Sequence, residues 1–129
     1  MKVVVFGLGY VGTTMTACML QDGHDVVGID ISAAKVALVR GGRSPIVEPG
    51  VDRALAAGMD DGRLGADIDA APYIPDADMA VVCVGTPSKR DGTLNLSQVV
   101  AAAGEIGGLV KSRPRHLPPL LVVFRSTMP

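Results

Sequence analysis

Aromatic side chains are scarce in this sequence: its 129 residues include two tyrosines, two phenylalanines and no tryptophan. A surface that binds single-stranded nucleic acid needs aromatic rings on which the bases stack. The formal net charge is −1, and lysine and arginine are scattered along the chain. Such a balance gives no long-range attraction to nucleic acid or to an anionic membrane. We therefore expect neither as a partner.

Cysteine is equally rare. Cys18 and Cys83 lie in apolar stretches, which predicts two inert core thiols in a reducing compartment. No cysteine–histidine cluster has metal-ligand spacing, so no metal site is predicted. No uninterrupted apolar run reaches the ~18 residues that a membrane-spanning helix needs, and glycines break the apolar start of the chain, unlike a signal peptide. These absences predict a soluble, cytoplasmic protein.

Apolar residues, in contrast, are plentiful: they make up 48% of the chain against 19% charged residues, which predicts a well-buried sheet. The length suits one domain, residues 1–129. Short apolar runs alternate with helical patterns, as in a parallel α/β sheet. We expect strands at 3–6, 25–30, 64–68, 79–84 and 120–124. The predicted fold class is α/β, a doubly wound parallel sheet in the strand order 3-2-1-4-5.

Four helical patterns connect these strands. The first ends near Gly23, and its expected buried face consists of Val11, Met15, Cys18 and Met19. Ser32 is expected to cap the second, which ends near Arg40. Pro49 suits the first turn of the third. The fourth opens at Ser97, and its expected buried face consists of Val99, Ala103, Ile106 and Val110.

The segment FGLGYVG, at 6–12, places three glycines between the first strand and the first helix. Gly7 permits a tight turn, Gly9 lets the backbone approach a pyrophosphate, and Gly12 lets the helix pack on the sheet. A purely structural turn is the alternative. The second strand favours a dinucleotide, because it ends in Asp30, 18 residues after Gly12 and near the expected spacing of about 20. An acid there binds a ribose diol and repels a 2′-phosphate, which predicts a Rossmann-type domain for NAD rather than NADP.

Three further segments lie in loops at the same end of the predicted sheet: GGRSPIVEPG (41–50), CVGTPSKRDGTLNL (83–96) and RSTMP (125–129). Together with FGLGYVG they resemble the UDP-glucose/GDP-mannose dehydrogenase family over the whole of residues 1–129. SPIVEPG and GTPSK are most similar to the members that act on GDP-mannose. The resemblance implies oxidation of a sugar nucleotide at C6, from alcohol to acid, with two NAD reduced and a cysteine that forms a thiohemiacetal and then a thioester. It also implies a role in polysaccharide biosynthesis.

The resemblance implies how NAD is held. The implied cofactor-binding residues are Gly7, Gly9, Tyr10, Val11, Gly12, Asp30, Lys35, Thr86 and Thr127. Tyr10 and Val11 offer backbone N–H groups to the pyrophosphate, and Lys35 reaches the ribose end of the site. Thr86 borders the dinucleotide after the fourth strand. Thr127, after the fifth strand, is expected near the nicotinamide.

In family members the catalytic cysteine, an assisting lysine and most sugar-nucleotide contacts come from later parts of the chain. Residues 1–129 therefore resemble the cofactor half of a homo-oligomeric enzyme, with no catalytic residue and no activity alone. Three alternatives stay open: a UDP-glucose 6-dehydrogenase, a hydroxyacid or hydroxyacyl-CoA dehydrogenase, and a non-catalytic nucleotide-sensing module. SPIVEPG argues against the second, and GTPSK and RSTMP favour an enzyme over the third.

Two local features carry their own interpretations. Glu48 is either an acid or base that faces the active site or a charge at the start of the third helix, and the helix charge is favoured. The segment KSRPRHLPP (111–119) is longer and richer in proline than the family's connection at this place. This departure affects the expected register just before the fifth strand.

Overall fold

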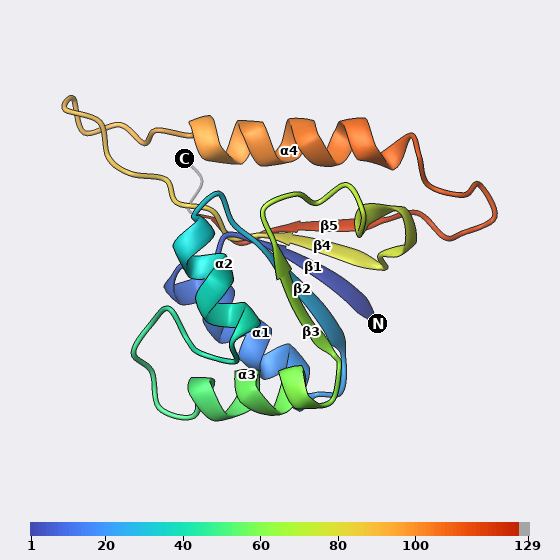
Figure 1. Ribbon diagram of the computed structural model, residues 1–129. Helices are drawn as coiled ribbons and strands as arrows, with labels where there is room; N and C mark the ends of the chain where they lie inside the picture. Colours follow the sequence, from blue (N-terminus) through green and yellow to red (C-terminus); the bar gives the residue numbers. More distant parts are fainter. Residues whose placement is uncertain (127–129) are drawn as a thin grey trace.

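The structure, a computed structural model, describes residues 1–126. Its centre is a sheet of five parallel strands in the order β3-β2-β1-β4-β5 (Figure 1). The strands are β1 (Lys2–Phe6), β2 (Asp25–Ile29), β3 (Leu64–Asp67), β4 (Met79–Val82) and β5 (Leu121–Phe124). The predicted doubly wound α/β fold and its strand order are confirmed. The third, fourth and fifth strands are slightly shorter than their apolar runs.

Strand β1 lies at the middle of the sheet because its residues tolerate burial on both faces. Val3 to Phe6 are all buried, at no more than 3% exposed. β1 pairs in parallel with β2 on one side and with β4 on the other, so that Val4 lies opposite both Val27 and Ala80. A parallel strand covered on both faces has no position that prefers a polar side chain, which explains the run VVVF.

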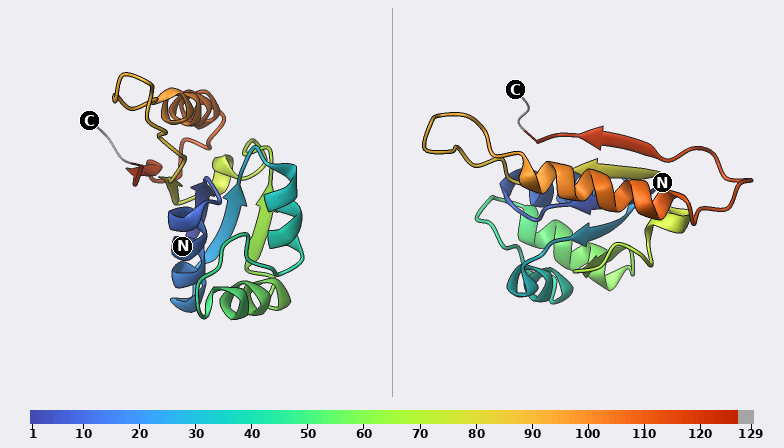
Figure 2. Two further views of the ribbon diagram at one scale, coloured as in Figure 1. Left: turned by 90° about the vertical axis from the view of Figure 1, so that its left-hand side faces the viewer. Right: turned by 90° about the horizontal axis from the view of Figure 1, so that it is seen from above.

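Three helices cover one face of the sheet: α1 (Tyr10–Gln21), α2 (Ala33–Arg40) and α3 (Val51–Asp60) (Figure 2). The predicted buried face of α1 is correct in part: Met15 and Met19 are half-buried and pack against the core, whereas Val11 and Cys18 do not. The helix buries Gly12, Thr13, Thr16, Ala17 and Leu20. Val11 and Cys18 are exposed, so Cys18 is not a core thiol. Small residues face the sheet because the glycine turn brings the start of α1 close to the backbone, and that close approach fixes the helix rotation.

Helix α4 (Ser97–Val110) and the 3₁₀ turn η1 (Ile74–Asp76) cover the opposite face (Figures 1 and 2). α4 buries Val99, Ala102 and Ile106. Of the predicted face, Val99 and Ile106 are confirmed, whereas Ala103 is half-buried and Val110 exposed. The helix thus presents a narrower buried stripe than its apolar sequence indicates.

Helix ends follow local chemistry. The Ser32 hydroxyl accepts a hydrogen bond from the Lys35 backbone N–H at 3.3 Å, and α2 ends at Arg40 with Gly41 as its C-cap, as predicted. α3 differs, because Gly50 has a left-handed backbone (φ 84°) immediately before the helix. Pro49 therefore precedes α3 instead of lying in its first turn. Gly50 turns the chain out of the loop 43–50, which glycine does without steric cost.

The long connection from α4 to β5 is held by one side chain. The Arg113 guanidinium donates to the carbonyl oxygens of Ile74 (2.9 Å), Ala77 (2.6 Å) and Pro118 (2.8 Å). These bonds join η1 to the proline-rich segment. The register of β5 is set by this contact and by its parallel pairing with β4, which aligns Val122 with Ala80.

Strand β5 is an edge of the sheet, and its side chains Leu121 and Phe124 are exposed. An uncovered edge strand has backbone groups free to pair with another chain. Within residues 1–126, no helix is both long and apolar enough to span a lipid bilayer.

Candidate cofactor-binding site

The carboxyl ends of the central strands lie at the left-hand end of the sheet in Figure 1. A cleft of about 980 Å³ is lined by residues at these strand ends. It lies between β1 and β4, whose following helices α1 and α4 cover opposite faces. Ligands of doubly wound sheets bind at such a switch point. Seven of the nine predicted residues line this cleft: Gly7, Gly9, Tyr10, Val11, Asp30, Lys35 and Thr86. Gly12 lies behind it, and Thr127 is outside the described residues.

Each of the three positions in the turn is occupied by glycine for a different structural reason. Gly7 has a positive φ of 99°, and a Cβ there would lie 2.8 Å from the backbone of Cys83. A Cβ at Gly12 would lie 1.7 Å from the carbonyl oxygen of Gly7. A Cβ at Gly9, in contrast, would meet no atom within 4 Å. The fold therefore requires glycine at Gly7 and Gly12, whereas Gly9 leaves space open in the cleft.

The open space above Gly9 adjoins the start of α1. The Gly9 carbonyl accepts the first helical hydrogen bond, from the Thr13 N–H at 3.0 Å, so α1 begins at Tyr10. The N–H groups of the first turn have no partner inside a helix, and the helix dipole adds a partial positive charge. Together with the open position at Gly9, this geometry fits a phosphate group.

Asp30 joins the ends of the first three strands. One carboxylate oxygen accepts the Leu8 N–H at 2.7 Å, and the other accepts the Ser32 N–H at 2.8 Å. The Asp30 N–H donates to the Asp67 carbonyl at 3.2 Å. An ionised carboxylate has about four acceptor positions, so the two bonds that orient Asp30 leave others for hydroxyl groups in the cleft.

The wall beside Asp30 includes two residues that the sequence analysis missed. Ile31, 88% exposed, and Ile68, 51% exposed, both line the cleft next to Lys35. Ile31 follows β2 and Ile68 follows β3, so their positions after the carboxyl ends of these strands could have predicted that they line the cleft. Exposed isoleucines at a cleft give an apolar surface suited to a flat ring, while Lys35 adds a positive charge.

The opposite wall comes from β4 and α4. Thr86 lies four residues after β4 and lines the cleft together with Gln98, Ala101 and Glu105 of α4. The sequence analysis missed the α4 residues. The sequence gives only a weak indication of these residues. It shows that the helix begins at Ser97, which places the first turns of α4 near the carboxyl end of the sheet.

Cys83 also lines the cleft and is half-buried rather than fully buried. Burial raises the pKa of the Cys83 thiol, and the positive charge of Arg125 partly offsets this effect. Its sulfur lies 3.8 Å from the sulfur of Met15. A nucleophilic cysteine needs a lowered pKa. Cys83 therefore belongs to the wall of the site rather than to its chemistry, and residues 1–126 contain no cluster of side chains suited to hold a metal ion.

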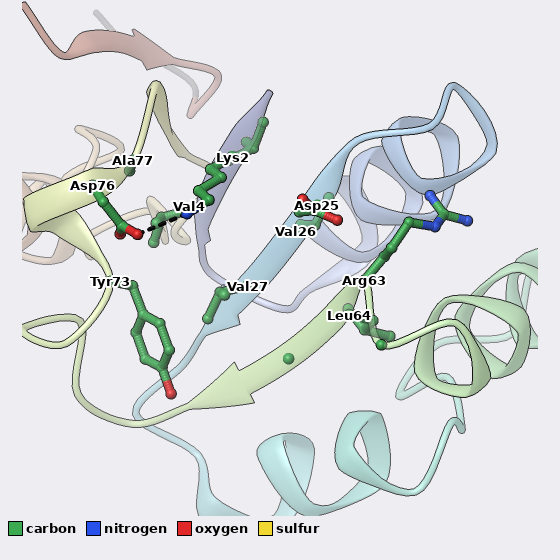
Figure 3. Close-up of a pocket in the computed structure, with 13 residues that line it drawn as sticks. Lys2, Val4, Asp25, Val26, Val27, Arg63, Leu64, Tyr73, Asp76 and Ala77 are labelled. Atoms are coloured by element: carbon green, nitrogen blue, oxygen red, sulfur yellow. Dashed lines mark hydrogen bonds and ion pairs between the residues drawn. The ribbon is translucent and has the colours of Figure 1, made fainter. Parts of the chain in front are cut away.

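A second hollow, of about 350 Å³, lies toward the amino ends of β1, β2 and β3, away from the cleft (Figure 3). Lys2 and Asp76 are paired across it at 2.8 Å, which raises the pKa of Lys2. Arg63 donates to the carbonyl oxygens of Leu20 and His24. These cations bind neighbouring protein groups, so we assign the hollow to the fold and not to a ligand.

Comparison with known proteins agrees with this geometry. Residues 1–129 match the model of the "UDP-glucose/GDP-mannose dehydrogenase family, NAD binding domain". The chain is 43% identical over 129 residues to the GDP-mannose 6-dehydrogenase of Pseudomonas savastanoi pv. phaseolicola, covering 99% of this chain and 28% of that protein. It is 38% identical over 130 residues to the UDP-glucose 6-dehydrogenase of Rhizobium meliloti, covering 100% and 28%.

Solved structures give the same result. The crystal structure of a ternary complex of GDP-mannose dehydrogenase from Pseudomonas aeruginosa has a TM-score of 0.92 and 40% identity over 99% of this chain and 29% of that one. A UDP-glucose dehydrogenase from Pyrobaculum islandicum has a TM-score of 0.90 and 37% identity with the same coverage. The chain thus spans less than a third of the length of these relatives, and the matched domain uses NAD as its cofactor. It belongs to the UDP-glucose/GDP-mannose dehydrogenase family of NAD-dependent oxidoreductases, whose NAD-binding domain it matches over residues 1–129.

Proposed function

We propose that this chain is the NAD-holding part of a nucleotide-sugar 6-dehydrogenase that acts on GDP-mannose. In the full reaction, GDP-mannose, two NAD⁺ and water give GDP-mannuronate and two NADH, with the release of protons from the two oxidation steps and from the acid formed. The observation that carries the proposal is the cleft at the switch point, which combines the open position at Gly9, the first turn of α1 and the carboxylate of Asp30. NAD, when bound, accepts the hydride. This chain's own residues bind and orient it.

Asp30 selects between the two nicotinamide dinucleotides in this proposal. Its orientation by the Leu8 and Ser32 N–H groups keeps the carboxylate at the cleft wall, where it accepts from a ribose diol. A 2′-phosphate at the same place would bring two anions together in a confined space. Lys35 lies at the same end and binds the neighbouring oxygen atoms.

The oxidation itself needs groups beyond this cleft. The covalent step requires an accessible thiolate of lowered pKa. Cys18 is exposed on α1 but does not line the cleft, and burial raises the pKa of Cys83. Hydride transfer also requires a sugar held ~3–3.5 Å from the nicotinamide. We therefore propose that residues 1–129 bind the cofactor and do not oxidise a sugar nucleotide alone.

Calorimetric titration of the chain with NAD, NADP, GDP-mannose and UDP-glucose tests this division of roles. We expect saturable binding of NAD and no NADH absorbance when NAD and either sugar nucleotide are supplied together. Steady NADH formation would show that the chain is a complete enzyme. Failure to bind NAD would refute the assigned role of the cleft.

The choice of sugar nucleotide is tested in a longer chain. UDP-glucose is the second candidate, supported by 38% identity to a UDP-glucose 6-dehydrogenase. If the gene of this chain encodes further domains, its full product should reduce NAD with GDP-mannose faster than with UDP-glucose. The reverse preference would replace the proposed substrate and leave the cofactor role intact.

Replacing Asp30 by serine is expected to reduce the preference for NAD over NADP. The variant loses a charged acceptor, a change that corresponds to roughly tenfold weaker NAD binding, and gains tolerance for a 2′-phosphate. The measurement is the ratio of the two dissociation constants by calorimetry. Asp60→Ser, at an exposed position outside the cleft, is the matched control and should keep the wild-type ratio. An unchanged ratio in Asp30→Ser would show that Asp30 does not read the ribose.

A further inference from the structure

The loop 43–50 contacts the glycine turn through one hydrogen bond. The Tyr10 hydroxyl donates to the Glu48 carboxylate at 2.5 Å, across 38 positions of sequence. Glu48 is therefore neither an acid in the cleft nor only a charge at the start of α3. Its carboxylate binds the side chain of the first residue of α1.

The rest of this loop is anchored elsewhere. The Ser44 N–H donates to Asp52 of α3 at 2.7 Å, and the Ser44 hydroxyl donates to the Ile46 carbonyl at 2.7 Å. Val47, between these anchors and Glu48, is 98% exposed. The loop thus rests on α3 at its beginning and on α1 at its end.

Tyr10 and Glu48 occupy different places relative to the cleft. Tyr10 lines it, whereas Glu48 does not, so the hydrogen bond turns the phenol toward the loop. The ring is 57% exposed, and the neighbouring position at Gly9 is open. A tyrosine side chain has few rotamers at a helix start. Within residues 1–126, the bond to Glu48 is the one hydrogen bond of the Tyr10 hydroxyl, so its loss would remove the group that orients the phenol beside the open position at Gly9.

We propose that Glu48 is a positioning residue for the cofactor: its carboxylate holds the Tyr10 phenol, and with it the end of the loop 43–50, beside the pyrophosphate site instead of across it. This inference rests on the cofactor role of the cleft. It assigns a task to the SPIVEPG segment, which lies outside the cleft wall. Glu48 acts on the dinucleotide only through Tyr10.

Charge alone predicts the opposite effect, which makes the proposal testable. Glu48 is an anion near the start of α1, where a pyrophosphate would bind, so its removal relieves a like-charge repulsion and should tighten binding. Loss of positioning should weaken binding. The sign of the change in the NAD dissociation constant therefore separates the two explanations.

The experiment measures NAD binding by calorimetry in wild type, Glu48→Ala, Tyr10→Phe and the double variant. We expect Glu48→Ala and Tyr10→Phe each to raise the dissociation constant about two- to tenfold, the range of one hydrogen bond. The double variant should match either single variant, because both remove the same bond. Asp60→Asn, which removes a charge from an exposed position outside the cleft, should leave the constant unchanged.

A spectroscopic readout reports the hydrogen bond itself. The chain has only two tyrosines, Tyr10 and Tyr73, and no tryptophan, so in a Tyr73→Phe background tyrosinate absorbance comes from Tyr10 alone. The Glu48 carboxylate, as hydrogen-bond acceptor and as negative charge, raises the pKa of Tyr10, and slight burial adds to this. Glu48→Ala should therefore lower the pH at which Tyr10 ionises in the absence of NAD.

The possible results are distinct. Tighter or unchanged NAD binding in Glu48→Ala, in a wild type that binds NAD, would overturn the positioning role and leave the cofactor assignment standing. If the changes in NAD binding free energy of the two single variants add up in the double variant, the positioning role would also be overturned, because the two residues would then act independently and not through their shared hydrogen bond. A wild type without NAD binding would refute the cofactor role and the positioning role together. The Tyr10 titration would then still report whether the hydrogen bond forms.

Discussion

Replacing Gly9 by valine is expected to abolish measurable NAD binding while the fold persists. A Cβ at Gly9 meets nothing within 4 Å, and the backbone of Gly9, at φ −81° and ψ −160°, is extended, so that valine fits there. The new side chain would instead occupy the space where we expect the pyrophosphate. We expect at least ~100-fold weaker binding, or about 2.8 kcal/mol. The free energy of unfolding should fall by no more than ~1 kcal/mol, the usual range for changing a residue that precedes a helix.

The measurements are calorimetry for NAD and urea unfolding followed by circular dichroism. Gly104→Val is the matched control, because Gly104 is exposed on α4, lies outside the cleft and has no atom within 4 Å of its Cβ position. This control should bind NAD as wild type does. Near-normal binding by Gly9→Val would mean that the pyrophosphate does not approach the turn at this position.

Replacing Gly12 by alanine is expected to damage the fold itself. The added Cβ would lie 1.7 Å from the Gly7 carbonyl oxygen, and both groups belong to or sit directly on the backbone. Neither is the end of a flexible side chain, so the turn or the start of α1 must move. We expect the free energy of unfolding to fall by about 3 kcal/mol, at the upper end of the range for overpacking. NAD binding should be lost as well, because the first turn of α1 shifts.

Gly104→Ala is the control for this second prediction. It makes the same chemical change in a helix where nothing opposes a Cβ. Alanine there should raise the free energy of unfolding by up to ~1 kcal/mol, since glycine is a poor helix former. The two variants should therefore move the urea midpoint in opposite directions. A stable Gly12→Ala would contradict the close contact between Gly7 and Gly12.

Features that depend on residues close in sequence, such as buried strands and helix caps, were predicted well. The local sequence preferences agree with the tertiary structure at these places. The valine-rich run 3–6 is buried on both faces, and Ser32 caps α2 as its side-chain chemistry indicates. The strand order 3-2-1-4-5 followed from short strands that alternate with helices. The spacing of the glycines and Asp30 similarly placed Gly7, Gly9 and Asp30 at the cleft, and the family resemblance added Tyr10, Val11, Lys35 and Thr86.

Contacts between distant segments could not be predicted, since no local pattern encodes them. The α1 face was assigned by hydrophobicity, but Gly7 and Gly12 pack closely against Cys83, after β4, and in the resulting orientation of the helix Cys18 is exposed. Ile68 and the α4 wall enter the cleft only once the sheet brings together the loops that follow its five strands.

The sequence by itself determined the parallel α/β fold, the place of the dinucleotide turn and the family. Each depends on residue types and spacings along the chain, which can be recognised without knowledge of the tertiary structure. Only the tertiary structure decided which glycine protects the fold and which opens the cleft, because that distinction depends on the distance of a Cβ from other segments. Tertiary structure also decided the partner of Glu48, since a hydrogen bond across 38 positions forms only after β2, α2 and the loop 43–50 have returned the chain to α1.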